Sequence, residues 1–108
     1  MDIDLPEPVA VYLEEENSDG VDAIARCFAA DAVVRDEGRT ISGIAAIQAW
    51  KRAAKARYRY RVEPLAARRN GDTVSVRVRT HGDFPGSPVE MDYTIGLAGD
   101  RIASLEIG

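Results

Sequence analysis

The stretch Phe28–Trp50, FAADAVVRDEGRTISGIAAIQAW, decides the fold of this chain. We expect a helix to end near its first residue, followed by a short apolar strand, Ala32–Asp36, that ends in an acid. Glu37-Gly38 is a turn signal, and Arg39–Ile41 then returns as a second short strand. Ser42-Gly43 opens another helix. The stretch therefore predicts a tight hairpin held between two helices.

Two helices are predicted before the hairpin. Pro6–Glu16 begins with a proline, which suits a first helical turn because its missing N–H would have no partner there. Its apolar stripe consists of Val9, Tyr12 and Leu13. Glu14–Glu16 are expected to face water. A second helix is predicted to start with Asp19 as its N-cap and to continue to Phe28.

After the hairpin, a third helix is predicted from Gly43 to about Arg57, with Trp50 on its core side and Lys51 mostly on its wet side. The apolar period then changes to two, which is typical of strands. Asn70-Gly71 predicts a two-residue hairpin turn, because both residues tolerate positive φ. Four long strands in a meander are expected to begin near Tyr58, Val74, Val89 and Arg101.

Three helices that precede a run of strands predict an α+β domain, and 108 residues form a single domain with one core, residues 1–108. We expect a cone-shaped, curved antiparallel sheet wrapped around the three N-terminal helices. The wide end of such a cone need not fill with side chains, so a ligand cavity is expected there.

The composition argues against several classes of function. The net charge of −4 and the lack of a Gly-rich phosphate loop argue against nucleic acid as a partner. No apolar run approaches the ~20 residues that cross a bilayer, and the acidic start does not resemble a signal peptide, so we expect no membrane contact and a cytoplasmic location. Cys27 and His81 are each the only residue of their type. We expect Cys27 to be buried and no metal site to exist.

Three pieces of the chain resemble the SnoaL-like branch of the nuclear transport factor 2-like superfamily. They are the helix end Phe28–Val34, the helix start Ser42-Gly43 with Ile47, and the closing turn Gly99–Ile102. The resemblance covers essentially the whole chain. Similar proteins include ketosteroid isomerases, polyketide cyclases, limonene epoxide hydrolase and scytalone dehydratase. The resemblance implies the cone fold, chemistry without a cofactor, and a homodimer formed through the outer face of the sheet.

The ketosteroid isomerases of this superfamily imply a site. Their general base corresponds to Asp36, and their phenol donor corresponds to Tyr12, 24 residues earlier. Their second oxyanion donor falls near Tyr93, where a phenol can still donate a hydrogen bond. The tyrosines that support the catalytic phenol correspond to Phe28 and Lys51, so that supporting network is absent. The residues expected to line the ligand site are Phe28, Trp50, Val76, Met91 and Leu105.

Each candidate also has a simpler interpretation. Tyr12 suits a core aromatic, Asp36 suits a hairpin residue that pairs with Arg35 or Arg39, and Tyr93 suits a sheet aromatic. Two functions therefore stay open. The first is binding of a small, mostly apolar molecule in the cone, with isomerase- or cyclase-type acid–base chemistry at Asp36. The second is a non-catalytic, dimeric module for ligand binding or protein association.

The loop Gly82–Pro88 carries a third, separate hypothesis. It contains two prolines and two glycines around Phe84. We expect Phe84 to form an exposed apolar tip that acts as a lid or contacts a partner.

Overall fold

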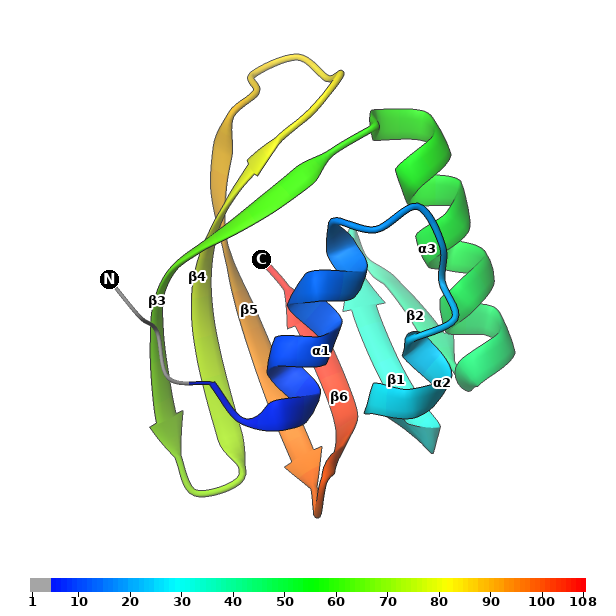
Figure 1. The fold of residues 1–108 in the computed structure, drawn as a ribbon, viewed down its shortest axis with the longest axis vertical. Helices are drawn as coiled ribbons and strands as arrows, with labels where there is room; N and C mark the ends of the chain where they lie inside the picture. Colours follow the sequence, from blue (N-terminus) through cyan, green and yellow to red (C-terminus); the bar gives the residue numbers. More distant parts are fainter. Residues whose placement is uncertain (1–4) are drawn as a thin grey trace.

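The computed structural model describes residues 5–108, and Figure 1 shows the helices on one side of a single curved sheet. The acidic start, from which the absence of a signal peptide was expected, includes residues 1–4, which lie outside the described residues. The elements are, in chain order, α1 (Glu7–Glu16), α2 (Ile24–Cys27), β1 (Phe28–Asp36), β2 (Arg39–Ser42), α3 (Ile44–Tyr58), β3 (Arg61–Asn70), β4 (Thr73–His81), β5 (Val89–Ala98) and β6 (Arg101–Ile107). The predicted α+β order of elements is confirmed.

The sheet has the strand order β2-β1-β6-β5-β4-β3. The predicted meander of β3 to β6 and the β1–β2 hairpin are both antiparallel. However, β1 pairs with β6 in parallel, so the sheet is mixed and the expectation of a wholly antiparallel sheet was wrong. The cause is the route of the chain. After the β1–β2 hairpin, α3 leads to β3 at the opposite edge of the sheet, and the meander then returns so that β6 lies beside β1 and runs in the same direction.

The two predicted hairpin turns are present, one of them shifted. Glu37 and Gly38 both have positive φ, 52° and 77°, as a type I′ turn requires. In the second hairpin Asn70 pairs with Thr73, so the turn residues are Gly71 and Asp72 rather than Asn70 and Gly71. Only Gly71 takes a positive φ there, 62°, which is the pattern of a type II′ turn.

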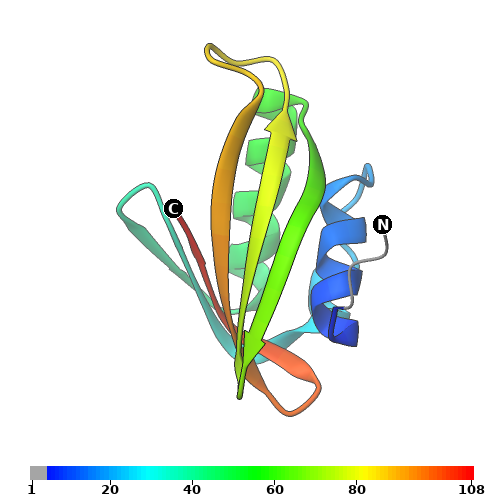
Figure 2. The same cartoon turned by 90° about the vertical axis from the view of Figure 1, so that its left-hand side faces the viewer.

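The helices bury the apolar stripe of the sheet, as Figure 1 shows for α1 in front of β5 and β6. In Figure 2, the view turned by 90°, α3 lies behind the strands β3 to β5. The largest core residues near α1 are Tyr12 and Phe28, whose rings meet edge to face at 5.4 Å. The alternating valines of β4, Val74, Val76 and Val78, are buried on one face of the strand. The core therefore fills the narrow part of the cone.

The second helix is shorter than predicted. It covers four residues, Ile24–Cys27, and has no side-chain cap, while Phe28 already begins β1. Residues 18–23 instead form a loop around the Lys55 ammonium, which donates to the carbonyl oxygens of Ser18 and Gly20 at 2.9 and 2.6 Å. Because Lys55 satisfies these carbonyls, the loop is stable without the helical hydrogen bonds.

The third helix is shifted by one residue from the prediction and runs from Ile44 to Tyr58. It includes Tyr58, and Arg59 ends it with a positive φ of 46°, donating its N–H to the Lys55 carbonyl. The strand therefore begins at Arg61 rather than at Tyr58. No helix among residues 5–108 is long and apolar enough to cross a membrane.

Candidate functional site

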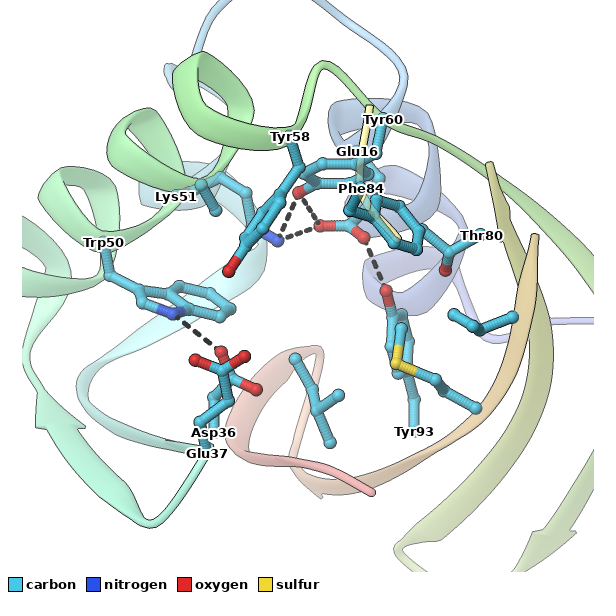
Figure 3. Close-up of a pocket in the computed structure, with 14 residues that line it drawn as sticks. Glu16, Asp36, Glu37, Trp50, Lys51, Tyr58, Tyr60, Thr80, Phe84 and Tyr93 are labelled. Carbon is cyan, nitrogen blue, oxygen red and sulfur yellow. Dashed lines mark hydrogen bonds and ion pairs between the residues drawn. The ribbon is translucent and has the colours of Figure 1, made fainter. Parts of the chain in front are cut away.

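A cavity of about 330 Å³ lies between α3 and the concave face of the sheet, at the end of the cone where the first hairpin turns (Figure 3). Its walls are mostly aromatic and aliphatic side chains, with a few acids and one lysine. The lining residues are Glu16, Asp36, Glu37, Trp50, Lys51, Ala54, Tyr58, Tyr60, Thr80, Phe84, Val89, Met91, Tyr93 and Ile107. An apolar cavity with a few polar groups is the usual form of a small-molecule site.

One polar group, at the rim, is the carboxylate of Asp36. Asp36 is the last residue of β1 and is half-buried, and the Trp50 indole N–H of α3 donates to its Oδ2 at 3.1 Å. Neither Arg35 nor Arg39 forms an ion pair with it in the described part of the chain. Next to it, Glu37 is exposed and also lines the cavity. The rim therefore carries two carboxylates without a cationic partner among residues 5–108.

The inner wall carries a buried hydrogen-bond network around Glu16, the last residue of α1 (Figure 3). Its Oε1 pairs with the Lys51 ammonium and accepts from the Tyr60 hydroxyl at 3.1 Å. Its Oε2 accepts from the Tyr93 hydroxyl at 2.6 Å. Lys51 also donates to the Tyr60 oxygen at 2.9 Å. These four residues, Glu16, Lys51, Tyr60 and Tyr93, are called the inner quartet below.

Burial sets the protonation of the inner quartet. Burial raises the pKa of Tyr93, and the Glu16 carboxylate raises it further, so the phenol stays a donor. Burial by itself would raise the pKa of Glu16, but the Lys51 ammonium and the hydrogen bonds of Lys51 and Tyr93 hold it below its usual value. Burial lowers the pKa of Lys51, an effect that the Glu16 carboxylate opposes. Glu16 is therefore a carboxylate, and Lys51 releases its proton more readily than an exposed lysine.

Aromatic rings surround the Lys51 ammonium. Its Nζ lies 4.3 Å from the centre of the Trp50 ring, 5.1 Å from that of Tyr12 and 5.4 Å from that of Tyr60. Such distances give favourable cation–π contacts, and they are stronger where the cation is desolvated. Trp50 thus contacts both polar groups of the cavity, since its N–H donates to Asp36 and its ring lies against the Lys51 ammonium.

The structure brings half of the predicted site residues to the cavity. Asp36, Trp50, Met91 and Tyr93 line it. The other four, Tyr12, Phe28, Val76 and Leu105, are at most 1% exposed and lie in the core rather than on the cavity wall. The Tyr12 hydroxyl has no hydrogen-bond partner in the described chain. Cys27 is buried as expected, and burial raises the pKa of its thiol to about 11.

The two charged residues of the inner quartet were not predicted from the sequence. Glu16 was expected to face water and Lys51 to lie on the wet side of its helix, yet they are 1% and 2% exposed. A signal was present in the spacing. Glu16 lies four residues after Tyr12 on the stripe of α1, and Lys51 lies four residues after Ile47 on that of α3. Two opposite charges on apolar stripes are the pattern of a buried pair.

The loop Gly82–Pro88 closes one side of the cavity. Phe84 is half-buried, lines the cavity, and meets the Tyr58 ring edge to face at 5.9 Å, so it is not the exposed tip that was expected. The loop is fixed to the end of α3, because the Asp83 N–H donates to the Tyr58 carbonyl at 2.7 Å. A Cβ on Gly82 would lie 2.7 Å from that same carbonyl, so only glycine fits this approach.

Comparison with known proteins places the chain in a family. Residues 9–103 match the model of the SnoaL-like domain. The chain belongs to the SnoaL-like family. No curated protein sequence matches it significantly.

Solved structures of SnoaL-like and related proteins agree with this assignment. A Sinorhizobium meliloti protein provisionally named a polyketide cyclase is 42% identical, with a TM-score of 0.93 over 96% of this chain and 95% of its own. A Catenulispora acidiphila protein with a ketosteroid isomerase-like fold, in complex with trimethylamine, is 26% identical, with a TM-score of 0.87 over 97% and 86%. An NTF2-like protein of unknown function from Cytophaga hutchinsonii, 11% identical, shares the fold with a TM-score of 0.80 over 100% and 91%.

Proposed function

We propose that this SnoaL-like protein binds a small, mostly apolar molecule in its cavity and moves a proton at Asp36 without a cofactor. The observation that supports the proposal is the setting of Asp36. Its carboxylate lies at the rim of an apolar cavity, half-buried, and a single N–H from Trp50 holds one of its two oxygens. A carboxylate that is positioned but not neutralised by a cation is suited to act as a general base.

The geometry assigns different tasks to the two oxygens of Asp36. Oδ2 accepts from Trp50, which fixes the plane of the carboxylate. Oδ1 is then available to take a proton from a bound C–H or O–H group and to return it at another atom of the same ligand. The predicted oxyanion donor Tyr93 already donates its hydrogen bond to Glu16, so it serves a ligand only if this bond is exchanged. Tyr12, the other predicted donor, does not line the cavity.

The relatives are compatible with this chemistry and widen the range of ligands to test. Cyclases and isomerases both shift protons next to carbonyl groups, and the Sinorhizobium meliloti relative carries the provisional name of a cyclase. The trimethylamine in the Catenulispora acidiphila relative adds small amines to the range. Aromatic walls and the acids Asp36 and Glu37 suit such a cation as well.

The test has a binding arm and an exchange arm. Trp50 is the only tryptophan and lines the cavity, so its fluorescence reports binding. We would titrate cyclic ketones, 1,3-diketones, phenols and trimethylamine. Bound carbon acids are then incubated in D₂O, and deuterium uptake next to the carbonyl is followed by NMR. We expect Asp36→Asn to slow uptake by at least about 10²-fold while ligands still bind. Glu37→Gln, which removes the neighbouring acid, is the matched control and should keep most of the exchange activity.

The outcome separates the two functions. If ligands bind but the wild type exchanges no faster than Asp36→Asn, the catalytic proposal is wrong and the non-catalytic binding module takes its place.

We also propose that the convex face of the sheet binds a second copy of the chain. Cross-strand ion pairs join Arg77 to Asp92 at 3.1 Å and Arg79 to Glu90 and Glu63 at 3.4 and 3.7 Å. Arg79 is half-buried, and the other four residues are exposed. A patch that alternates both signs is complementary to its own copy across a twofold axis. In sedimentation equilibrium, Arg77→Glu should shift the protein towards monomer. Arg39→Glu, on the exposed edge strand β2, should not. A monomeric wild type refutes this proposal.

A further inference from the structure

Lys51 has a chemical setting that proton transfer at Asp36 does not use. It is one of only two lysines of the chain, it lines the cavity, and it is 2% exposed. An ammonium group has three N–H donors, and the structure assigns two of them, one to Glu16 and one to the Tyr60 oxygen. Its nitrogen therefore lies at an apolar cavity, next to an acid and a phenol.

We propose that Lys51 is an amine nucleophile that captures aldehydes entering the cavity as a protein-bound iminium ion. This activity is separate from the proton transfer at Asp36. It rests on one half of the proposed function, the admission of small apolar molecules to the cavity. The chemical class of the ligand is an aldehyde, or an activated ketone, with an apolar body.

A buried amine of this kind is a better nucleophile than an exposed one. Only the neutral amine attacks a carbonyl carbon, and desolvation by apolar walls favours the neutral form of a lysine. Burial lowers the pKa of Lys51 in this way. The proton that Lys51 loses passes to Glu16, so no uncompensated charge is left in the core, and the hydroxyls of Tyr60 and Tyr93 still donate to the Glu16 carboxyl group at 3.1 and 2.6 Å. The two phenols thus keep Glu16 satisfied while Lys51 reacts.

The reaction balances within the inner quartet. Glu16 takes one proton from the Lys51 ammonium, and the freed lone pair forms a C–N bond to the carbonyl carbon. The carbonyl π electrons move to oxygen, which is protonated to give a carbinolamine. The carbinolamine oxygen then leaves as water, taking up the two hydrogens that the ammonium has lost. The net change is one ammonium plus one aldehyde giving one iminium plus one water, with no oxidant or reductant and no change of charge.

The product is stabilised by the groups that hold the ammonium now. The iminium cation remains beside the Glu16 carboxylate, so the buried ion pair is kept. The rings of Trp50, Tyr12 and Tyr60, 4.3 to 5.4 Å from the nitrogen, stabilise a delocalised cation as they do the ammonium. The ligand body then lies among the apolar lining residues, which favours aldehydes with hydrocarbon bodies over charged ones.

The second lysine is a built-in control. The Lys55 ammonium pairs with Glu15 at 2.9 Å and donates to the Ser18 and Gly20 carbonyls. Its N–H donors are directed at these oxygen acceptors, and Lys55 does not line the cavity. The chain therefore contains one lysine at the cavity and one bound to oxygen acceptors outside it.

The experiment traps the iminium by reduction. The full chain is incubated with butanal or benzaldehyde and sodium cyanoborohydride, and the N-alkylated residues are located by peptide mapping and mass spectrometry. We expect modification at Lys51 to be at least about tenfold faster than at Lys55 under limiting aldehyde, since only Lys51 faces the apolar cavity. Glyoxylate, an anionic aldehyde, should label Lys51 poorly because the rim acids repel it.

Two variants make the result decisive. Lys51→Arg keeps a cation beside Glu16 and should lose the cavity adduct. Asp36→Asn should retain it, so a failure of proton transfer and a failure of iminium capture can be told apart. Equal labelling of Lys51 and Lys55, or labelling of Lys51 that is no faster for butanal than for glyoxylate, overturns the proposal. Because the comparison of the two lysines is made within the wild type, it holds even if a variant does not fold.

Discussion

The two polar ends of the cavity are built on opposite principles. At the inner end, the Glu16 carboxylate is fully buried and accepts three hydrogen bonds from the chain itself. At the rim, the Asp36 carboxylate is half-buried and accepts one, from Trp50. The inner charge is neutralised by Lys51, whereas the rim charge has no cationic partner among residues 5–108. The same functional group is thus part of the packing in one place and available to a ligand in the other.

The inner quartet contributes more to the stability of the fold than Asp36 does. The inner quartet joins α1, α3, the residue directly before β3, and β5, and therefore holds the helices to the sheet. Asp36 joins only β1 to α3 through a single side-chain bond. Breaking the inner end should therefore destabilise the protein strongly, and altering the rim should change its chemistry at little cost in stability.

The largest effect is expected from breaking the buried ion pair. Lys51→Met leaves the Glu16 charge without its ammonium, and we expect a loss of about 3–5 kcal/mol in the free energy of unfolding. The measurement is urea denaturation followed by Trp50 fluorescence and circular dichroism. Asp36→Asn, the matched change at the rim, should cost less than about 1 kcal/mol, because a single partly exposed hydrogen bond contributes little.

The double variant Glu16→Gln with Lys51→Met checks the reason for this loss. It removes both charges, so it should be clearly more stable than Lys51→Met alone. If the two single losses simply add, the cost comes from disturbed packing and not from an uncompensated charge.

Local patterns predicted the fold better than they predicted the site. The alternation of Val74, Val76 and Val78 identifies the strand β4 and its buried face without knowledge of the rest of the chain. The parallel pairing of β1 with β6 has no local signal, because its partners are about 70 residues apart and their pairing depends on the whole route of the chain. Local spacing also placed the hairpin turn at Asn70-Gly71 only to within one residue, since Gly71-Asp72 is an equally good turn.

Two of the residues predicted as catalytic line the cavity, but the two buried charges of the inner quartet were not predicted. The resemblance to known relatives identified Asp36 and Tyr93, and both line the cavity. Glu16 and Lys51 were assigned to solvent because charged residues are rarely buried without a partner. Each one's partner is 35 residues away in the sequence, so neither assignment could be corrected from its own helix. The helical spacing indicates that Glu16 and Lys51 lie on buried faces, but only when the two opposite charges are considered as a pair.

Two buried hydroxyls differ in their position: that of Thr80 belongs to the cavity wall and that of Tyr12 to the core. Tyr12 Oη and Thr80 Oγ1 have no hydrogen-bond partner in the described chain. Removing a buried hydroxyl that lacks a partner should stabilise a protein by about 1 kcal/mol. We therefore expect Tyr12→Phe and Thr80→Val each to raise the thermal midpoint. Thr80 lines the cavity and Tyr12 does not, so Thr80→Val alone should alter ligand affinity in the Trp50 titration. A ligand effect of Tyr12→Phe would show that the core and the wall are not separate.

The smallest effect is expected at the rim turn. Glu37 and Gly38 have positive φ values of 52° and 77°. For a residue with a Cβ, such as Glu37, this backbone conformation is unfavourable in free energy. Asn-Gly is the preferred pair for a type I′ turn, so Glu37→Asn should stabilise the fold by about 0.5 kcal/mol. Glu37→Gln removes the same charge but keeps the unfavourable backbone, and it should leave stability nearly unchanged. If the two variants weaken the binding of trimethylamine equally, the charge of Glu37 serves the ligand. If only Glu37→Asn weakens it, the backbone of the turn matters instead, because it sets the position of the adjacent Asp36.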